Sequence, residues 1–104
     1  MNTIWMIHCA CGAGLATSLI MQLNAEKALL KLNRNDIKVT HSAAESIREE
    51  GADIFVVGRD LAYRFKHFPR VIVINQIMSF DEIYEKLKIA LSQTSDTFWI
   101  EDNL

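Results

Sequence analysis

The stretch that decides the fold reads Cys9-Ala10-Cys11-Gly12-Ala13-Gly14-Leu15-Ala16-Thr17-Ser18. An apolar run over residues 4–7 leads into it, and a long helical pattern begins at Leu19. A buried strand that turns through glycines into a helix is typical of a phosphate-binding loop, because a helix N-terminus offers unpaired N–H groups and about half a positive charge. Glycine also permits the backbone angles that let successive N–H groups curve around an anion.

Cys11 stands at the mouth of this loop, directly before the first glycine. A thiol at a helix start has a pKa of ~3.5–7.5 instead of ~8.5, so thiolate is available at neutral pH. The segment therefore predicts a cysteine that acts as a nucleophile and carries a phosphoryl group.

Length and composition predict one ordinary globular domain. The chain has 104 residues, of which half are apolar, and this is enough to bury a core. The formal net charge of −2, without a clustered basic face, predicts that nucleic acid is not a partner. The chain shows no signal sequence or membrane-length apolar run, and its two cysteines cannot form a disulfide framework. We therefore expect a cytoplasmic protein.

Four apolar segments alternate with helical patterns along the chain. The expected strands cover residues 4–8, 37–40, 53–57 and 70–74, and their unbroken apolar character suits strands that are covered on both faces. The alternation predicts an α/β fold: a three-layer α/β/α sandwich with a four-stranded parallel doubly wound sheet. In such sheets ligands bind at the carboxyl ends of the strands, near a topological switch point.

The helical patterns predict where each helix begins and which face it buries. Capping boxes at Ser42 to Glu45 and at Ser79 to Glu82 predict two helix starts, the first helix ending near Gly51. A short helix is expected at residues 61–66. The first long helix, over residues 16–32, is expected to bury the face that carries Ala16, Leu19, Ile20, Leu23 and Leu30. The last helix is expected to bury Ile83, Leu87, Ala90 and Leu91.

The helical pattern stops after Ser92. We therefore expect a carrier domain over residues 1–92 and a C-terminal tail over residues 93–104. The isolated apolar triplet at 98–100 indicates either a strap laid over the domain or a partly disordered end.

From Cys11 the chain reads C-G-A-G-L-A-T-S, which resembles the phosphorylation loop of the IIB components of the bacterial sugar phosphotransferase system. The resemblance is closest to the galactitol and ascorbate branch, and it extends through the strand–helix alternation to about residue 92. It implies that Cys11 accepts a phosphoryl group from a phosphohistidine on a IIA protein. The group then passes to a sugar or polyol held by the membrane component IIC, without a metal or organic cofactor.

The resemblance also implies how the phosphate is held. The donors would be backbone N–H groups of the loop together with the hydroxyls of Thr17 and Ser18. The full phosphate-binding set is Gly12, Ala13, Gly14, Leu15, Ala16, Thr17 and Ser18. Docking to IIC would bring the protein transiently to the inner face of the membrane. Cys9 has no counterpart in the family pattern.

A small cysteine phosphatase of the low-molecular-weight type is the alternative function. Its loop has arginine six residues after the cysteine, where this chain has Thr17. Arginine stabilises phosphoryl charge in the transition state, and losing such a group costs orders of magnitude in rate. Those enzymes also use an aspartate beside a proline as the acid, whereas Pro69 follows Phe68. We therefore expect transfer rather than hydrolysis.

Several other residues have a functional and a structural interpretation. Cys9 is expected to be a small buried hydrophobe, although a Cys9–Cys11 redox pair in a non-catalytic module stays open. His8 and the two cysteines lack the fourth ligand of a zinc site, so no metal is expected. His8 could tune Cys11 or carry phosphate, and Arg59 could contact phosphate or a IIA protein. The aromatic residues expected in the core or in a docking patch are Phe65, Phe68 and Phe98.

Overall fold

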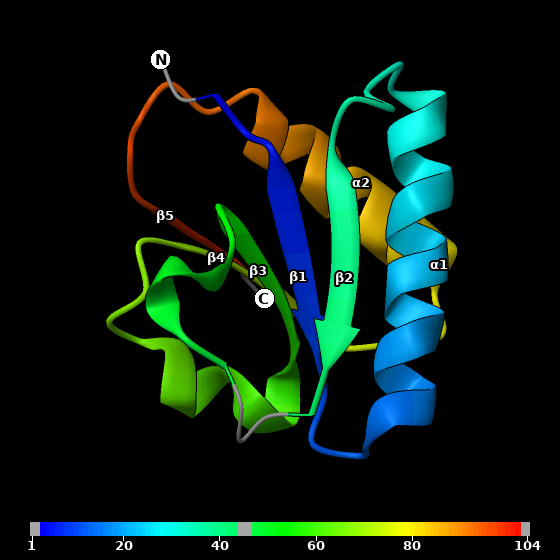
Figure 1. Ribbon diagram of the computed structural model, residues 1–104, viewed down its shortest axis with the longest axis vertical. Helices are drawn as coiled ribbons and strands as arrows, with labels where there is room; N and C mark the ends of the chain where they lie inside the picture. The colour runs from blue at the N-terminus through cyan, green and yellow to red at the C-terminus, as the bar shows by residue number, and fades with distance from the viewer. Residues whose placement is uncertain (1–2, 44–46, 103–104) are drawn as a thin grey trace.

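The computed structural model describes residues 3–43 and 47–102. Within these residues one parallel sheet crosses the molecule in the order β2-β1-β3-β4-β5 (Figure 1). The strands are β1 (Met6–Ala10), β2 (Lys38–Ser42), β3 (Ile54–Gly58), β4 (Arg70–Ile74) and β5 (Phe98–Ile100). From β1 the chain continues to β2 on one side and then to β3 on the other, so the topological switch point lies between β1 and β3.

The prediction of four strands is wrong, because the tail supplies a fifth strand. Phe98 lies opposite Arg70 at the outer edge of β4, and the Phe98 N–H donates to the carbonyl oxygen of Pro69 at 2.8 Å. The Arg70 guanidinium donates to the carbonyl oxygen of Asp96 at 2.8 Å and thereby fixes the segment that precedes β5. The open edge of β4 pairs with the backbone of this apolar segment. Residues 98–100 therefore form a strand, and not the expected strap or disordered end.

Both α-helices lie on one face of the sheet. α1 (Leu15–Lys31) and α2 (Phe80–Leu91) pack against each other and share one core with β1, β3 and β4. The other face is covered by the short 3-10 helices η2 (Glu49–Gly51) and η3 (Arg59–Phe65) and by a cluster of aromatic rings. The predicted α/β fold with a parallel sheet flanked by helices is therefore present, with α-helices on one side of the sheet and 3-10 helices on the other.

The strands alternate between these two cores. In β3, Ile54 and Val56 face the α-helices, while Phe55 and Val57 face the 3-10 helices. Phe65 and Phe68 pack on Phe55 with ring centroids 5.8 Å and 4.9 Å away, so both belong to the core. Phe98 is half-buried and packs against the core on the α-helical side.

The buried face of α1 differs from the predicted one. Leu19, Leu23 and Leu30 are exposed, as is Ala16, and Ile20 is half-buried. The helix instead buries Ser18, Met21, Ala25, Ala28 and Leu29. Apolar residues occur almost all round this helix, so periodicity alone does not select a face. The face with two alanines packs on the sheet because small side chains let the helix backbone approach closely.

The capping box at the start of α2 is only half formed. The Glu82 N–H donates to the Ser79 hydroxyl at 3.2 Å, as predicted. The Glu82 carboxylate, however, accepts the N–H groups of Asn75 at 2.7 Å and Gln76 at 2.8 Å instead of returning to Ser79. It also accepts from the buried Lys86 ammonium at 2.7 Å. The loop after β4 is thereby tied to α2.

The other two predicted helices are also modified. The first capping box begins at Ser42, which is the last residue of β2, and its residues 44 and 45 lie outside the described residues. What is described before Gly51 is the single turn η2. The short helix expected at residues 61–66 is present as η3.

Candidate functional site

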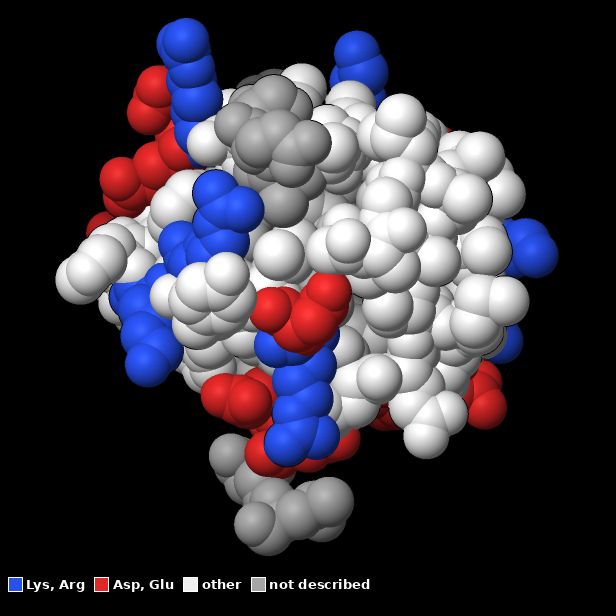
Figure 2. Space-filling view, turned by 90° about the horizontal axis from the view of Figure 1, so that it is seen from below, with Lys and Arg blue, Asp and Glu red and all other residues white. Residues whose placement is uncertain are grey.

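The loop between β1 and α1, residues 11–14, lies at the carboxyl ends of the strands and next to the switch point between β1 and β3. In Figure 1 it forms the blue turn below β1, and Figure 2 shows this end of the molecule from below. Open parallel sheets of this strand order bind their ligands at this position.

Gly14 has a backbone conformation that requires glycine. Its φ of 115° and ψ of −171° fall in a region that is essentially closed to other residues. Its N–H donates to the Cys11 carbonyl oxygen at 3.3 Å. The first helical hydrogen bond of α1 runs from the Ser18 N–H to the Gly14 carbonyl oxygen at 3.2 Å. The N–H groups of residues 15–17 precede this bond and have no acceptor inside the helix.

Cys11 is a free thiol beside these N–H groups. The Ala13 N–H points at its Sγ atom at 3.4 Å. The residue is only 1 % exposed. A Cβ atom placed on Gly58 would lie 3.3 Å from the Cys11 Sγ and 3.6 Å from the Ile77 Cδ1, so the end of β3 covers the sulfur from one side and the Ile77 side chain lies nearby. A reaction partner has to displace part of this cover.

One acidic side chain that sequence reasoning missed lies against the loop. Asp60 is exposed and follows β3 directly, as the second residue of η3. A Cβ atom on Gly12 would overlap the Asp60 Oδ2, and one on Gly58 would lie 2.7 Å from its Oδ1. Glycine at both positions therefore lets the carboxylate approach the loop. The sequence offered one clue to Asp60, which is its place just after β3. The carboxyl ends of neighbouring parallel strands meet at one edge of the sheet, so a residue there lies near the Cys11 loop.

The two predicted hydroxyl ligands are bonded within the protein. The Thr17 hydroxyl donates to the Gly14 carbonyl oxygen at 3.0 Å. Ser18 is fully buried, and its hydroxyl donates to the Leu15 carbonyl oxygen at 3.0 Å and lies 2.9 Å from the His41 Nδ1. Ser18 thus joins the start of α1 to β2.

His8 is bonded on both sides of its ring and does not face Cys11. Its Nδ1 lies 2.6 Å from the Thr40 hydroxyl and its Nε2 lies 2.7 Å from the Ser42 hydroxyl. Burial, and in addition the charge of His41, lower the pKa of His8 from its ordinary value. The ring therefore joins β1 to β2 on the face opposite the α-helices.

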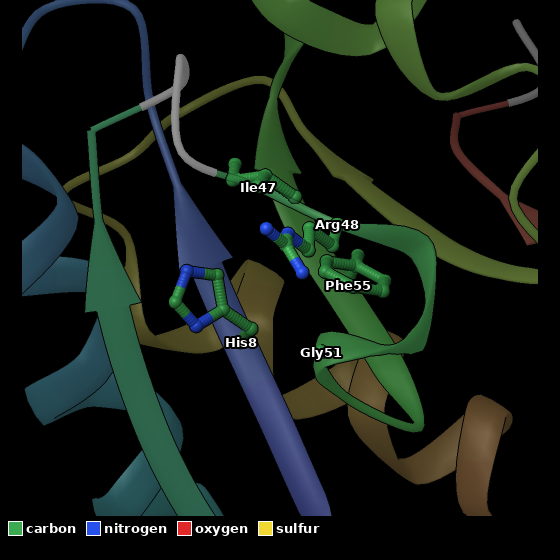
Figure 3. A pocket seen from close by; sticks show the side chains of 5 residues that line it. All are labelled: His8, Ile47, Arg48, Gly51 and Phe55. Atoms are coloured by element: carbon green, nitrogen blue, oxygen red, sulfur yellow. The ribbon is translucent and has the colours of Figure 1, made fainter.

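Figure 3 shows a cavity of about 160 Å³ on that same face, lined by His8, Ile47, Arg48, Gly51 and Phe55. The Arg48 guanidinium points toward the His8 side of the cavity, whereas the His8 ring is directed toward β2. No residue of the Cys11 loop lines this cavity, so it is separate from the thiol.

Arg59 lies at the edge predicted for it but beside another group of side chains. It borders a shallow hollow with Asn75, Glu101 and Asp102. Figure 2 shows charged side chains of both signs gathered on one side of this end of the molecule, while the side where α1 begins is largely uncharged.

Two further observations concern the described residues only. They contain no group of three His, Cys, Asp or Glu side chains arranged to hold a metal ion. None of the helices that they form is long and apolar enough to cross a bilayer.

Comparison with known proteins assigns this chain to a family. Residues 6–89 match the family model "PTS system, Lactose/Cellobiose specific IIB subunit". Among solved structures, the lactose-specific IIB component domain of the phosphoenolpyruvate:carbohydrate phosphotransferase system from Streptococcus pneumoniae has a TM-score of 0.61 at 12% identity. That likeness covers 89% of this chain and 100% of the other, and at this identity it concerns the fold alone. Comparison with the curated proteins found no match.

The matched residues include the strand, loop and helix that build the site, and they extend through β4 into α2. The match is to the lactose/cellobiose family and does not single out a galactitol or ascorbate branch. IIB subunits function with IIA and IIC partners in sugar transport. The chain therefore belongs to the lactose/cellobiose family of phosphotransferase-system IIB subunits, the phosphocarrier components in which phosphoryl transfer proceeds through a cysteine.

Proposed function

We propose that Cys11 is the cysteine that carries the phosphoryl group. The only other cysteine, Cys9, is fully buried in the core, where burial and the charge of Glu26 raise the pKa of its thiol. A thiol that does not ionise is a poor nucleophile. Cys11 lies at the end of β1, where the Ala13 N–H is directed at its sulfur. That contact carries the proposal, because it sets the sulfur beside the donors that an attached phosphoryl group needs.

We infer that backbone N–H groups of the loop and of the first turn of α1 hold the phosphoryl group. The N–H groups of residues 15–17 lack helical acceptors, and the helix dipole favours an anion there. The Thr17 hydroxyl can join them by rotating away from the Gly14 carbonyl oxygen. Ser18 would position the start of α1 rather than contact the phosphoryl group, since its hydroxyl and N–H are both bonded within the protein.

These donors favour transfer over hydrolysis. Residues 12–18 contain no arginine or lysine, so the phosphoryl group is held by neutral N–H and hydroxyl groups. Without a cation that stabilises the transition state for attack by water, the phosphocysteine persists until its acceptor docks.

The partners that we propose are a IIA protein with a phosphohistidine and a IIC component that holds the sugar or polyol. Both approach the carboxyl edge of the sheet, because the Cys11 loop lies there. Leu15, Leu19 and Leu23 in α1, and Met78 in the loop between β4 and α2, have exposed side chains. A small interface of this kind suits transient docking. With these partners the protein works in the cytoplasm and at the inner face of the membrane.

We propose the galactitol and ascorbate branch for the substrate, since the glycines at positions 12 and 14 and the Thr-Ser pair resemble that branch. Vesicles that contain a galactitol-type or a lactose-type IIC would separate the possibilities. Label should move from this protein to galactitol and not to lactose.

The carrier role is tested by phosphorylation with phosphoenolpyruvate, the general carrier proteins and a matching IIA. Intact-mass analysis should show one added phosphoryl group, which is lost in Cys11→Ser and kept in Cys9→Ser. Label that stays in Cys11→Ser and is lost in His8→Ala would move the acceptor to the imidazole. Steady turnover of an aryl phosphate by the purified protein would favour the phosphatase alternative.

A further inference from the structure

We propose that Asp60 is the general base that takes the proton from the acceptor hydroxyl when the phosphoryl group leaves Cys11. This inference rests on the proposal that Cys11 is the carrier. It starts from the contact of the Asp60 carboxylate with Gly12 and Gly58, the glycines that flank the sulfur.

The carboxylate lies within reach of the reacting atoms. Measured from the Cβ position of Gly58, the Asp60 Oδ1 lies at 2.7 Å and the Cys11 Sγ at 3.3 Å, so the two atoms are at most about 6 Å apart. In-line attack brings the acceptor oxygen to ~3–3.5 Å from the phosphorus, on the side away from the sulfur. A carboxylate this close to the sulfur can hydrogen-bond an acceptor at that position.

Of the two transfers away from phosphocysteine, only one needs a base. When the phosphoryl group returns from Cys11 to a IIA histidine, the attacking nitrogen of the neutral imidazole has no proton to lose. When a hydroxyl attacks the phosphocysteine, the P–O bond forms, the P–S bond breaks and the sulfur leaves as thiolate. The hydroxyl proton passes to the Asp60 carboxylate, which is exposed and returns it to water. A carboxylate has this role in protein kinases, where it accepts the proton of the substrate hydroxyl.

The other titratable groups near the loop are already occupied. Both ring nitrogens of His8 contact hydroxyls, and the His41 Nδ1 contacts the Ser18 hydroxyl. Arg59 borders the hollow formed with Asp102, and its guanidinium offers only donors and no acceptor for a proton. Within residues 3–43 and 47–102, the Asp60 carboxylate has no hydrogen bond or ion pair, so it is free to turn toward an acceptor.

The test compares hydroxyl acceptors with an imidazole acceptor. Four proteins are first phosphorylated through IIA: wild type, Asp60→Asn, Asp60→Glu and Asp96→Asn. Asp96 is the matched control, because it is an exposed acidic residue that precedes β5, at the edge of the sheet opposite the Cys11 loop. Equal labelling of all four is expected. Failure of the wild type to label at Cys11 would reject the carrier proposal itself, before Asp60 is tested.

The labelled proteins are then isolated and given one of three acceptors: water, galactitol with vesicles containing a galactitol-type IIC, or unphosphorylated IIA. In Asp60→Asn, transfer to water and to galactitol should slow by ~10²–10⁴-fold, the range of general-base catalysis, while return to the IIA histidine keeps its rate. Asp60→Glu should restore part of the hydroxyl transfer.

Two results would overturn the proposal. Asp60→Asn with wild-type rates to both hydroxyl acceptors would show that no base is needed at this position. Equal slowing or equal acceleration of all three transfers would show that Asp60 acts on the phosphoryl group or on the loop, by charge repulsion or by packing, and not on the hydroxyl proton.

Discussion

Replacing Gly14 by alanine isolates the backbone conformation of the loop. At φ 115° and ψ −171°, a residue with a Cβ atom costs about 1–3 kcal/mol. No atom lies within 4 Å of a Cβ at this position, so no contact is lost or gained and the backbone accounts for the whole effect. Alanine also restricts the unfolded chain, which offsets about 0.4–1 kcal/mol. We expect Gly14→Ala to lower the free energy of unfolding by about 1.3 kcal/mol, the difference between the midpoints of these two ranges, and by no more than about 2.6 kcal/mol.

Urea denaturation followed by circular dichroism measures this loss. Gly51→Ala is the matched control, because its Cβ would also have no neighbour within 4 Å and its φ is not positive. That variant should be as stable as the wild type, or more stable by up to about 1 kcal/mol. Phosphorylation through IIA should slow in Gly14→Ala alone, because the N–H groups beside residue 14 turn away. Equal unfolding free energies of the two variants would refute the argument that position 14 requires glycine.

Three further predictions concern the sulfur, the helix face and the pH dependence. Ile77→Ala should raise the rate at which iodoacetamide alkylates Cys11 several-fold, because a side chain near the sulfur is shortened; an unchanged rate would mean that Ile77 does not limit access to the sulfur. Leu23→Gln should change the free energy of unfolding by less than about 0.5 kcal/mol, whereas Met21→Ala should lower it by about 2–5 kcal/mol. If urea denaturation gave the reverse order, the face of α1 with Leu23 would be the buried one, as the sequence predicted. Since the pKa of His8 is lowered from 6.5, the unfolded chain binds its proton at a higher pH than the folded protein does. Stability should therefore fall as the pH drops below about 6.5, and less steeply in His8→Gln, as unfolding in urea at pH 8 and pH 5 would test.

The parts of the fold that follow from short-range pattern were predictable. β3 and β4 are continuous apolar runs, and the expected strands at 53–57 and 70–74 agree with the observed ones to within one residue. The loop at residues 11–14 was predictable for the same reason, since a strand, two glycines and a helix follow one another directly. Such signals need no knowledge of what the segment contacts in space.

The errors arise where distant segments meet. The face of α1 depends on how closely Ala25 and Ala28 approach the sheet, and the apolar residues around the helix do not select it. β5 exists because β4 leaves an open edge, which the triplet at 98–100 pairs with. Asp60 reaches the loop because Gly12 and Gly58 leave room for its carboxylate, and no local pattern connects these three residues.

The exposed leucines at the start of α1 agree with the short-lived docking that a carrier requires. Leu15, Leu19 and Leu23 are 57%, 41% and 48% exposed. Complete burial of a leucine contributes ~1.5–3 kcal/mol, so covering the exposed half of three leucines contributes about 2–4 kcal/mol. Association costs an estimated ~4–15 kcal/mol in lost freedom of motion, so these side chains alone cannot hold a long-lived complex. Charge and shape at the rest of the edge must supply the remainder of the binding free energy, so a partner that lacks complementary charges there should not form a lasting complex.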